Sequence, residues 1–221
     1  MPIPQLKVIA LGPLAIGNDN AKSNVRLTST AQLLLIYLLT TGEPQLREEL
    51  AELFWPERSA KQSASNLRTV LTELRKVCAP YLVITRTTIA VDATHVHYDV
   101  TAFQQALAKA NEGQKRQDLA AATAYWETAV RLHQRPFLTA FQARMGPDVQ
   151  LWLIQERELL YNQMLGAVRQ LVKYYSDLQN FEALLPLAQR WFLPGGAAVG
   201  GDSQRNKSVF INEVFTPVGH G

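Results

Sequence analysis

The chain has 221 residues, of which 47% are hydrophobic and 19% are charged, so it can bury a core and does not have the composition of a disordered protein. Its single cysteine, Cys78, excludes a disulfide framework and a zinc site of clustered cysteines, and is typical of a cytoplasmic protein. The net charge of +3 excludes a histone-like protein, and the longest apolar run, 33–39, is too short to cross a membrane.

The N-terminal stretch predicts strands. Residues 6–16, LKVIALGPLAI, are mostly apolar and have a break at Gly12-Pro13, which predicts two short strands and not a secretory signal. A turn is expected at 18–20, and a third short strand over 25–28.

Two helices are expected next. Residues 31–41 are apolar nearly all round, which predicts a short, buried, central helix that ends at Gly42. A second helix is expected from about Arg47, with two acidic residues favourably placed in its first turn, to a stop at Trp55-Pro56.

The stretch 61–78 predicts a third, amphipathic helix. At 3.6 residues per turn its apolar side chains share one narrow stripe. They are Ala64, Leu67, Leu71, Leu74 and Cys78, with Val70 at the edge of the stripe. The opposite face has short hydroxyls between cations. Taken alone, this pattern is that of an ordinary surface helix.

The charge distribution favours a different interpretation of this helix. Residues 57–90 carry six cations against two acids, whereas residues 1–100 carry ten cations against nine acids. The positive charge of the first half is therefore concentrated on the third helix and the segment after it. Such a local excess is the electrostatic pattern of a nucleic-acid binder.

A hairpin is expected after the third helix, with its tip at 86–88, although the tip lacks the Asn-Gly or Asp-Gly of the tightest turns. The order of strands, three helices and a hairpin predicts a winged helix-turn-helix. In that fold the second helix of the pair lies in the major groove, where base edges form a unique donor and acceptor code. Arg86 at the tip could reach phosphates or the minor groove.

The second half predicts helices throughout. They are expected over 100–113, 119–132, 149–175 and 181–192. Small residues alternate with bulky ones, as antiparallel pairs need for close stacking, so an all-α, tetratricopeptide-like domain is expected, although the 34-residue period is not clean. The sequence after 193 loses helical periodicity.

Several motifs resemble those of a known family. In the first half they are Leu11-Gly12-Pro13-Leu14, Leu46-Arg47-Glu48-Glu49-Leu50, Leu53-Phe54-Trp55-Pro56-Glu57, Ser65-Asn66-Leu67-Arg68 and Leu74-Arg75-Lys76. In the second half they are Asp99-Val100-x-x-Phe103, Pro136-Phe137-Leu138-x-x-Phe141, and Trp152 with Arg157 and Leu160. The ordered set resembles the antibiotic-regulatory-protein type of bacterial transcription activator, in which an OmpR-like winged helix precedes a bacterial transcriptional activator domain. That family usually has glycines flanking the Phe-Leu pair, where this chain has Arg135 and Ala140.

The resemblance implies a sequence-specific DNA-binding transcriptional regulator of the activator type that contacts double-stranded promoter DNA and RNA polymerase. The helical domain would form a homodimer or receive a signal. The DNA-binding residues carried over from the family are Lys61, Ser65, Asn66, Arg68, Thr69, Thr72, Arg75, Lys76 and Arg86. Of these, Ser65, Thr69 and Thr72 are expected to read bases, and Lys61, Arg68 and Lys76 to bind phosphate or guanine.

The expected domains are a winged helix over 1–95, a helical domain over 96–193, and a glycine-rich, poorly ordered tail over 194–221, which would also fit a truncated form of a longer regulator. The alternative function is a helical-repeat scaffold whose winged helix binds protein rather than DNA.

The sequence shows no arrangement of residues that predicts an enzyme, a metal site or a cofactor. His95 and His97 lack further ligands of the right kind nearby, and Cys78 lies on the core-facing stripe, where a thiol is inert. The stretch 196–203 is close to a phosphate-binding loop, but Asp202 stands where the lysine is needed.

Overall fold

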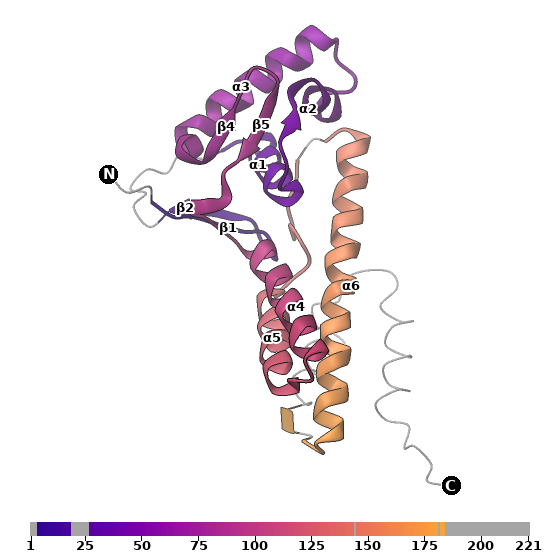
Figure 1. The fold of residues 1–221 in the computed structure, drawn as a ribbon. Coiled ribbons are helices and arrows are strands. Elements are labelled where there is room, and N and C mark those ends of the chain that lie inside the picture. Colours follow the sequence, from indigo (N-terminus) through magenta and orange to yellow (C-terminus); the bar gives the residue numbers. More distant parts are fainter. Residues whose placement is uncertain (1–3, 19–26, 144, 181, 184–221) are drawn as a thin grey trace. The chain divides into compact units, whose positions relative to one another are not determined.

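The computed structural model describes residues 4–18, 27–143, 145–180 and 182–183 (Figure 1). Contacts divide the chain into two compact units. The first unit combines Met1–Ala102 with Phe137–Leu159, and the second combines Phe103–Pro136 with the chain from Leu160 onward. This division differs from the domain boundaries at 95 and 193 expected from the sequence, which stay a prediction.

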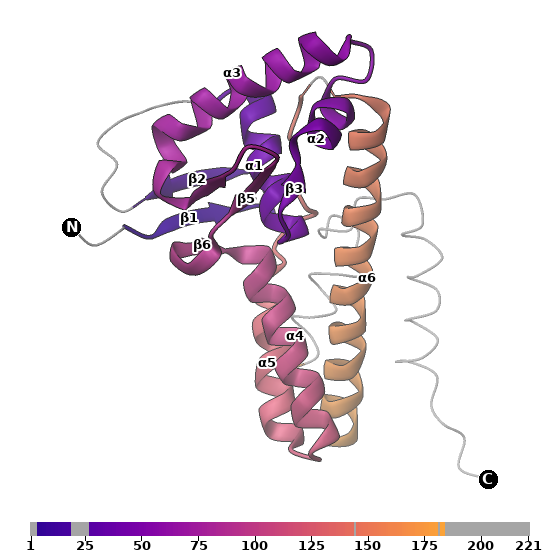
Figure 2. The ribbon, with the colours of Figure 1, turned by 45° about the horizontal axis from the view of Figure 1, so that its top comes forward.

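In its described residues, the first unit contains two small sheets (Figure 2). One has the strand order β2 (Ala15–Asn18), β1 (Leu6–Ile9), β6 (Val96–Tyr98), and the other has the order β3 (Gln45–Leu46), β5 (Thr88–Val91), β4 (Leu82–Ile84). The two strands expected within 6–16 and the hairpin are confirmed. Strand β6, which the sequence did not predict, contains His97 and pairs in parallel with β1.

Three helices complete the helix-turn-helix part of this unit: α1 (Ser29–Thr41), α2 (Arg47–Phe54) and α3 (Ala60–Cys78). The strand expected over 25–28 is wrong for the described residues 27–28. Thr28 is instead the N-cap of α1, and its side chain accepts a hydrogen bond from the N–H of Ala31. Residues 25–26 and most of the expected turn at 18–20 lie outside the described residues. Gly42 ends α1 in the left-handed conformation at φ 70°, as predicted.

The helix α3 packs its apolar stripe on α1 and α2. Its buried residues are Ser63, Leu67, Val70, Leu71, Leu74 and Cys78, so the predicted stripe is confirmed except that Ala64 is only half-buried. Burial raises the pKa of the Cys78 thiol to about 11, so the thiol is neutral at physiological pH.

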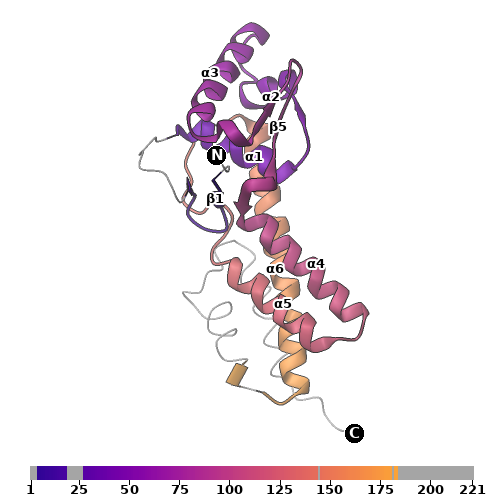
Figure 3. The ribbon, with the colours of Figure 1, turned by 60° about the vertical axis from the view of Figure 1, so that its left-hand side comes forward.

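The second unit is helical. It holds most of α4 (Asp99–Lys115), all of α5 (Leu119–Leu132) and the later part of α6 (Pro147–Asp177) (Figure 3). The helix predicted over 119–132 has those bounds, and the other two extend one or two residues beyond the predicted ends. Tyr175 on α6 donates a hydrogen bond to Glu127 on α5.

The predicted fold class, an α+β winged helix-turn-helix with an all-α part, is confirmed. All but two residues of the helix expected over 181–192, the tail over 194–221 and the stretch 196–203 lie outside the described residues. In the part of the chain that is described, no helix is long and apolar enough to cross a membrane.

Candidate nucleic-acid interface

The predicted DNA-binding residues of α3 share one side of the helix. Seven of them are exposed, and these are Lys61, Ser65, Arg68, Thr69, Thr72, Arg75 and Lys76. Asn66 is half-buried and lies toward the flank of this face. The N-cap residue Ser59 accepts a hydrogen bond from the N–H of Gln62, which fixes the first turn of the helix.

The single acidic residue of α3 is engaged with α1. Glu73 is half-buried, and its carboxylate accepts hydrogen bonds from the backbone N–H and, at 2.8 Å, from the hydroxyl of Thr28. The contact ties α3 to the N-terminus of α1, where the helix dipole favours a negative charge. The exposed face of α3 therefore presents cations and hydroxyls without a neighbouring acid from its own helix.

Two of the expected base-reading hydroxyls donate within α3. Thr69 Oγ1 donates to the carbonyl of Ser65 at 3.2 Å, and Thr72 Oγ1 donates to the carbonyl of Arg68 at 2.9 Å. Each hydroxyl thus uses its proton in the helix and keeps its oxygen as an acceptor. In the major groove such an acceptor suits the amino groups of adenine and cytosine.

The hairpin tip is formed by threonine side chains. Thr88 N–H donates to Thr85 Oγ1 at 2.9 Å, and Thr85 N–H donates to the carbonyl of Thr88 at 3.0 Å. This arrangement places Arg86 and Thr87, both exposed, at the end of the wing. The tip is also joined to the start of α2, because Arg47 N–H donates to the carbonyl of Thr87 at 2.9 Å.

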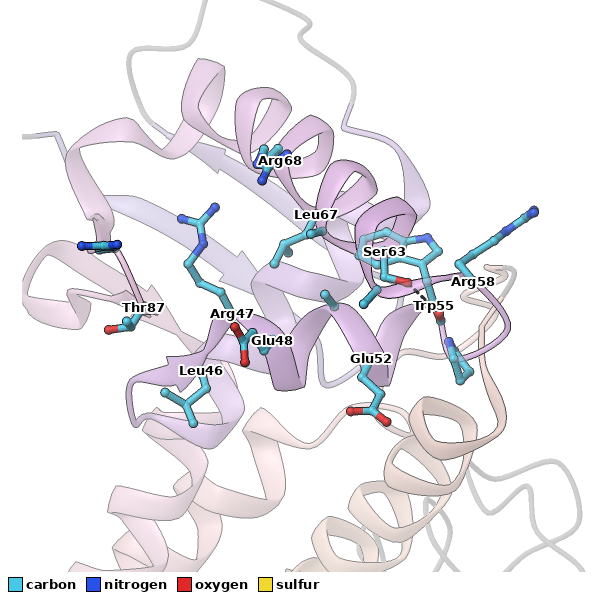
Figure 4. Close-up of a pocket in the computed structure, with 15 residues that line it drawn as sticks. Leu46, Arg47, Glu48, Glu52, Trp55, Arg58, Ser63, Leu67, Arg68 and Thr87 are labelled. Carbon is cyan, nitrogen blue, oxygen red and sulfur yellow. Dashed lines mark hydrogen bonds between the residues drawn. The ribbon is translucent and has the colours of Figure 1, made fainter.

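A groove of about 650 Å³ lies between α2, the turn before α3, α3 itself and the wing tip (Figure 4). Four arginines line it, and these are Arg47, Arg58, Arg68 and Arg86. In Figure 4, Arg47 extends from α2 into the space below α3, whereas Arg58 extends outward from the turn. Glu52, on the α2 side of the groove, points away from α3. The structure thus brings Arg68 of the helix and Arg86 of the wing to one site.

Sequence reasoning did not place Arg47 and Arg58 in this site. The positive charge counted over 57–90 included Arg58, but its position in a short connection gave no direction for the side chain. Arg47 is followed by two glutamates in the sequence, so the local net charge is negative and did not indicate a cationic site. Arg47 is half-buried, and its guanidinium is 3.5 Å from the carbonyl oxygen of Thr85.

The chemistry of this surface suits a polyanion. Guanidinium groups bind phosphates and guanine in a bidentate manner, and short hydroxyls accept from base amino groups. Within the described residues, no three His, Cys, Asp or Glu side chains are grouped so that they could hold a metal ion.

Comparisons with known proteins agree with this architecture. Residues 98–193 match the family described as the bacterial transcriptional activator domain. The fold is similar to that of EmbR from Mycobacterium tuberculosis, solved in complex with a low affinity phosphopeptide, with a TM-score of 0.58 and 14% sequence identity. The likeness covers 96% of this chain and 66% of the EmbR chain, so this chain spans just under two thirds of that protein. No curated protein matches the chain significantly in sequence.

The bacterial transcriptional activator domain predicted from the sequence motifs is therefore confirmed over residues 98–193, and the chain has a fold similar to that of EmbR.

Proposed function

We propose that this protein is a sequence-specific DNA-binding transcription regulator, in which α3 lies in the major groove and the β4–β5 wing contacts the DNA backbone or the minor groove. The observation that carries the proposal is the composition of the exposed face of α3. That face has four cations and three hydroxyls, while the only acid of the helix is held by Thr28. A surface of this kind favours a phosphate-lined groove over plain solvent.

The residues have distinct proposed roles. Ser65, Thr69 and Thr72 read base edges from the middle of the face, with the two threonines acting as acceptors. Lys61, Arg68 and Lys76 bind phosphates or guanine. Arg86 on the wing binds the backbone or the minor groove, while Asn66 and Arg75 contribute from the edges of the face. Arg47, which the groove adds to this set, binds a phosphate beside Arg86.

The remainder of the chain supports a regulatory role. Because residues 98–193 are a bacterial transcriptional activator domain, we propose that they promote transcription at double-stranded promoter DNA, with RNA polymerase as the partner, and that they form a homodimer or receive a signal.

The test begins with selection of a binding duplex from a random-sequence library, followed by affinity measurements on that duplex over a range of salt concentrations. Arg68→Ala and Lys76→Ala should weaken binding, and each lost phosphate contact should reduce the slope of log affinity against log salt by about 0.9. Lys173→Ala, which removes an exposed cation from the second unit, is the matched control and should bind like the wild type.

Two results would contradict the proposed role of α3. If no duplex is enriched, or if both α3 variants bind with the wild-type affinity and salt slope, α3 is not the reading helix. A salt-insensitive association with a protein, without DNA, would then favour the helical-repeat scaffold.

A further inference from the structure

We infer that the segment 137–159 is a positioning element of the helix-turn-helix, which holds the turn between α2 and α3 and so sets the affinity of α3 for DNA. The DNA part of this inference rests on the proposed function. The segment lies inside the stretch that matches the activator domain, yet it packs as part of the first unit together with the two sheets and α1–α3. We call it the bracket.

One end of the bracket is bonded to the chain after β1. The N–H of Leu138 donates to the carbonyl of Ala10 at 2.7 Å, and the N–H of Thr139 donates to the carbonyl of Gly12 at 3.0 Å. The buried carboxylate of Asp99 accepts from the N–H of Ala10 at 2.9 Å on the same stretch. Backbone groups that are paired in this way keep the bracket in register with the sheet.

Arg157 on α6 closes this end of the bracket. Its guanidinium donates to the carbonyl of Phe137 at 2.8 Å and to the carbonyl of Leu138 at 2.9 Å. A planar guanidinium that binds two successive carbonyls fixes both the turn and the rotation of α6 about its axis. The start of α6 is thereby held in a defined orientation within the first unit.

The start of α6 then contacts the helix-turn-helix through aromatic rings. Trp152 lies edge-on to Tyr37 of α1 with ring centroids 5.0 Å apart, and Tyr37 lies edge-on to Phe54 of α2 at 6.0 Å. Phe54 is followed by Trp55, whose carbonyl accepts from the buried hydroxyl of Ser63 on α3 at 3.0 Å. The contacts therefore run without a break from the bracket to the third helix.

A second contact reaches the turn directly. An ideal Cβ built on Gly146 would lie 2.9 Å from Cδ of Pro56 and 3.3 Å from the carbonyl oxygen of Leu53. The backbone of the bracket thus lies against the turn with no space for a methyl group. Gly166, in the second-unit part of α6, offers a contrast, because a Cβ there meets nothing within 4 Å.

The turn that the bracket contacts also borders the candidate DNA site. Trp55 and Pro56 line the groove together with Arg68 and Arg86. A shift of Pro56 would therefore move the first turn of α3, which carries Lys61, relative to the wing. Because packed side chains respond to such shifts in discrete steps, a small displacement can change the affinity for a rigid partner.

The experiment compares Gly146→Ala with Gly166→Ala in the full chain. Affinity is measured for the duplex selected from the random library and for a mixed-sequence duplex at low salt. We expect Gly146→Ala to lose about tenfold in affinity for the selected duplex, within the usual range of coupling energies. The slope of its log affinity against log salt concentration should stay unchanged, because no phosphate contact is removed. Gly166→Ala should bind like the wild type.

Hydrogen exchange of the turn provides a readout that needs no DNA. The amides of Arg58 and Ser63 are bonded to the carbonyls of Trp55 and Ser59 at 3.1 Å and 2.9 Å. In Gly146→Ala these amides should exchange faster than in the wild type, while amides of α5 keep their protection.

Trp152 supplies a second pair of variants in case Gly146→Ala does not fold. Trp152→Ala should reduce affinity and turn protection, whereas Trp152→Phe, which keeps a ring against Tyr37, should restore most of both. The control on the same helix is Leu151→Ala, because Leu151 is 54% exposed.

The outcomes separate this inference from the proposed function. If the wild type binds and Arg68→Ala does not, while the bracket variants show wild-type affinity and turn protection, the inference is overturned and the proposed function stands. If the wild type binds no duplex, the proposed function is overturned, and hydrogen exchange of the turn between α2 and α3 tests the positioning role by itself. Faster exchange in Gly146→Ala than in the wild type supports that role, and equal exchange overturns it.

Discussion

At the scale of single residues, the turn after Phe137 takes a conformation that its sequence disfavours. Leu138 and Ala140 have positive φ angles of 50° and 58°, a region that side chains with a Cβ rarely adopt. The related family usually has glycines around this Phe-Leu pair, and Ala140 stands at one of those positions. This conformation is therefore held at an energetic cost by Arg157 and by the bonds to Ala10 and Gly12.

We expect Ala140→Gly to stabilise the first unit by about 0.5–1 kcal/mol, because glycine relieves the left-handed strain, although it also makes the unfolded chain more flexible. Urea unfolding followed by tryptophan fluorescence measures the change. The matched control is Ala143→Gly, in the same loop but not among the described residues with positive φ. That change should be neutral or destabilising, and equal effects of the two would contradict the argument.

At the scale of elements, regular helices were predictable because local periodicity determines them. The helix α5 has the bounds predicted from its alternating small and large residues, and the stripe of α3 is buried largely as its spacing implies. Strand β6 was missed because it has only three residues and pairs with β1, which lies almost ninety residues earlier in the sequence. Nothing local in such a segment distinguishes a strand from a linker.

Some features of the candidate site were likewise predictable from the sequence, and others were not. Exposure of Lys61, Arg68 and Lys76 follows from helical spacing, which the sequence contains. The contact of Glu73 with Thr28 joins two helices, and its effect on the local charge therefore appears only in the fold. The rotation of Arg47 into the groove likewise depends on the pairing of its backbone with the wing tip.

The close pairing of α4 with α5 gives a prediction at this scale. A Cβ on Gly113 of α4 would lie 3.1 Å from the backbone nitrogen of Ala122 and 3.2 Å from its Cα, and backbone atoms cannot yield unless α5 moves. We expect Gly113→Ala to destabilise the second unit by about 1 kcal/mol, because overpacking exceeds the gain in helix propensity.

Gly166→Ala, for which there is open space, should instead stabilise by up to about 1 kcal/mol. Urea unfolding followed by circular dichroism at helical wavelengths compares the two variants. A gain in stability for Gly113→Ala would show that α4 and α5 stack less closely than their backbones indicate.

At the scale of the whole molecule, the two units are interleaved along the chain. The chain leaves the first unit after Ala102 and re-enters it at Phe137. A winged helix cut from this protein at a sequence-based boundary would therefore lack part of its own packing.

We expect a fragment of residues 1–102 to be less stable than the first unit of the full chain by about 3 kcal/mol or more, because it loses Trp152, and removal of a large aromatic side chain typically costs this much. Trp55 is the only tryptophan of such a fragment, so its fluorescence during urea unfolding reports on the turn. An unchanged urea midpoint for the turn in the fragment and the full chain would show that residues 137–159 are dispensable.

The return of the chain at Phe137–Leu159 also has a consequence for biosynthesis. A ribosome that has completed Ala102 must still add the residues up to Leu159 before the first unit can close, which takes about 3–11 s at typical elongation rates. During this interval Tyr37 lacks its ring partner Trp152, and the carbonyls of Ala10 and Gly12 lack theirs. The nascent chain should therefore acquire protease resistance in this unit only after Leu159 emerges, which stalled chains of graded length can test.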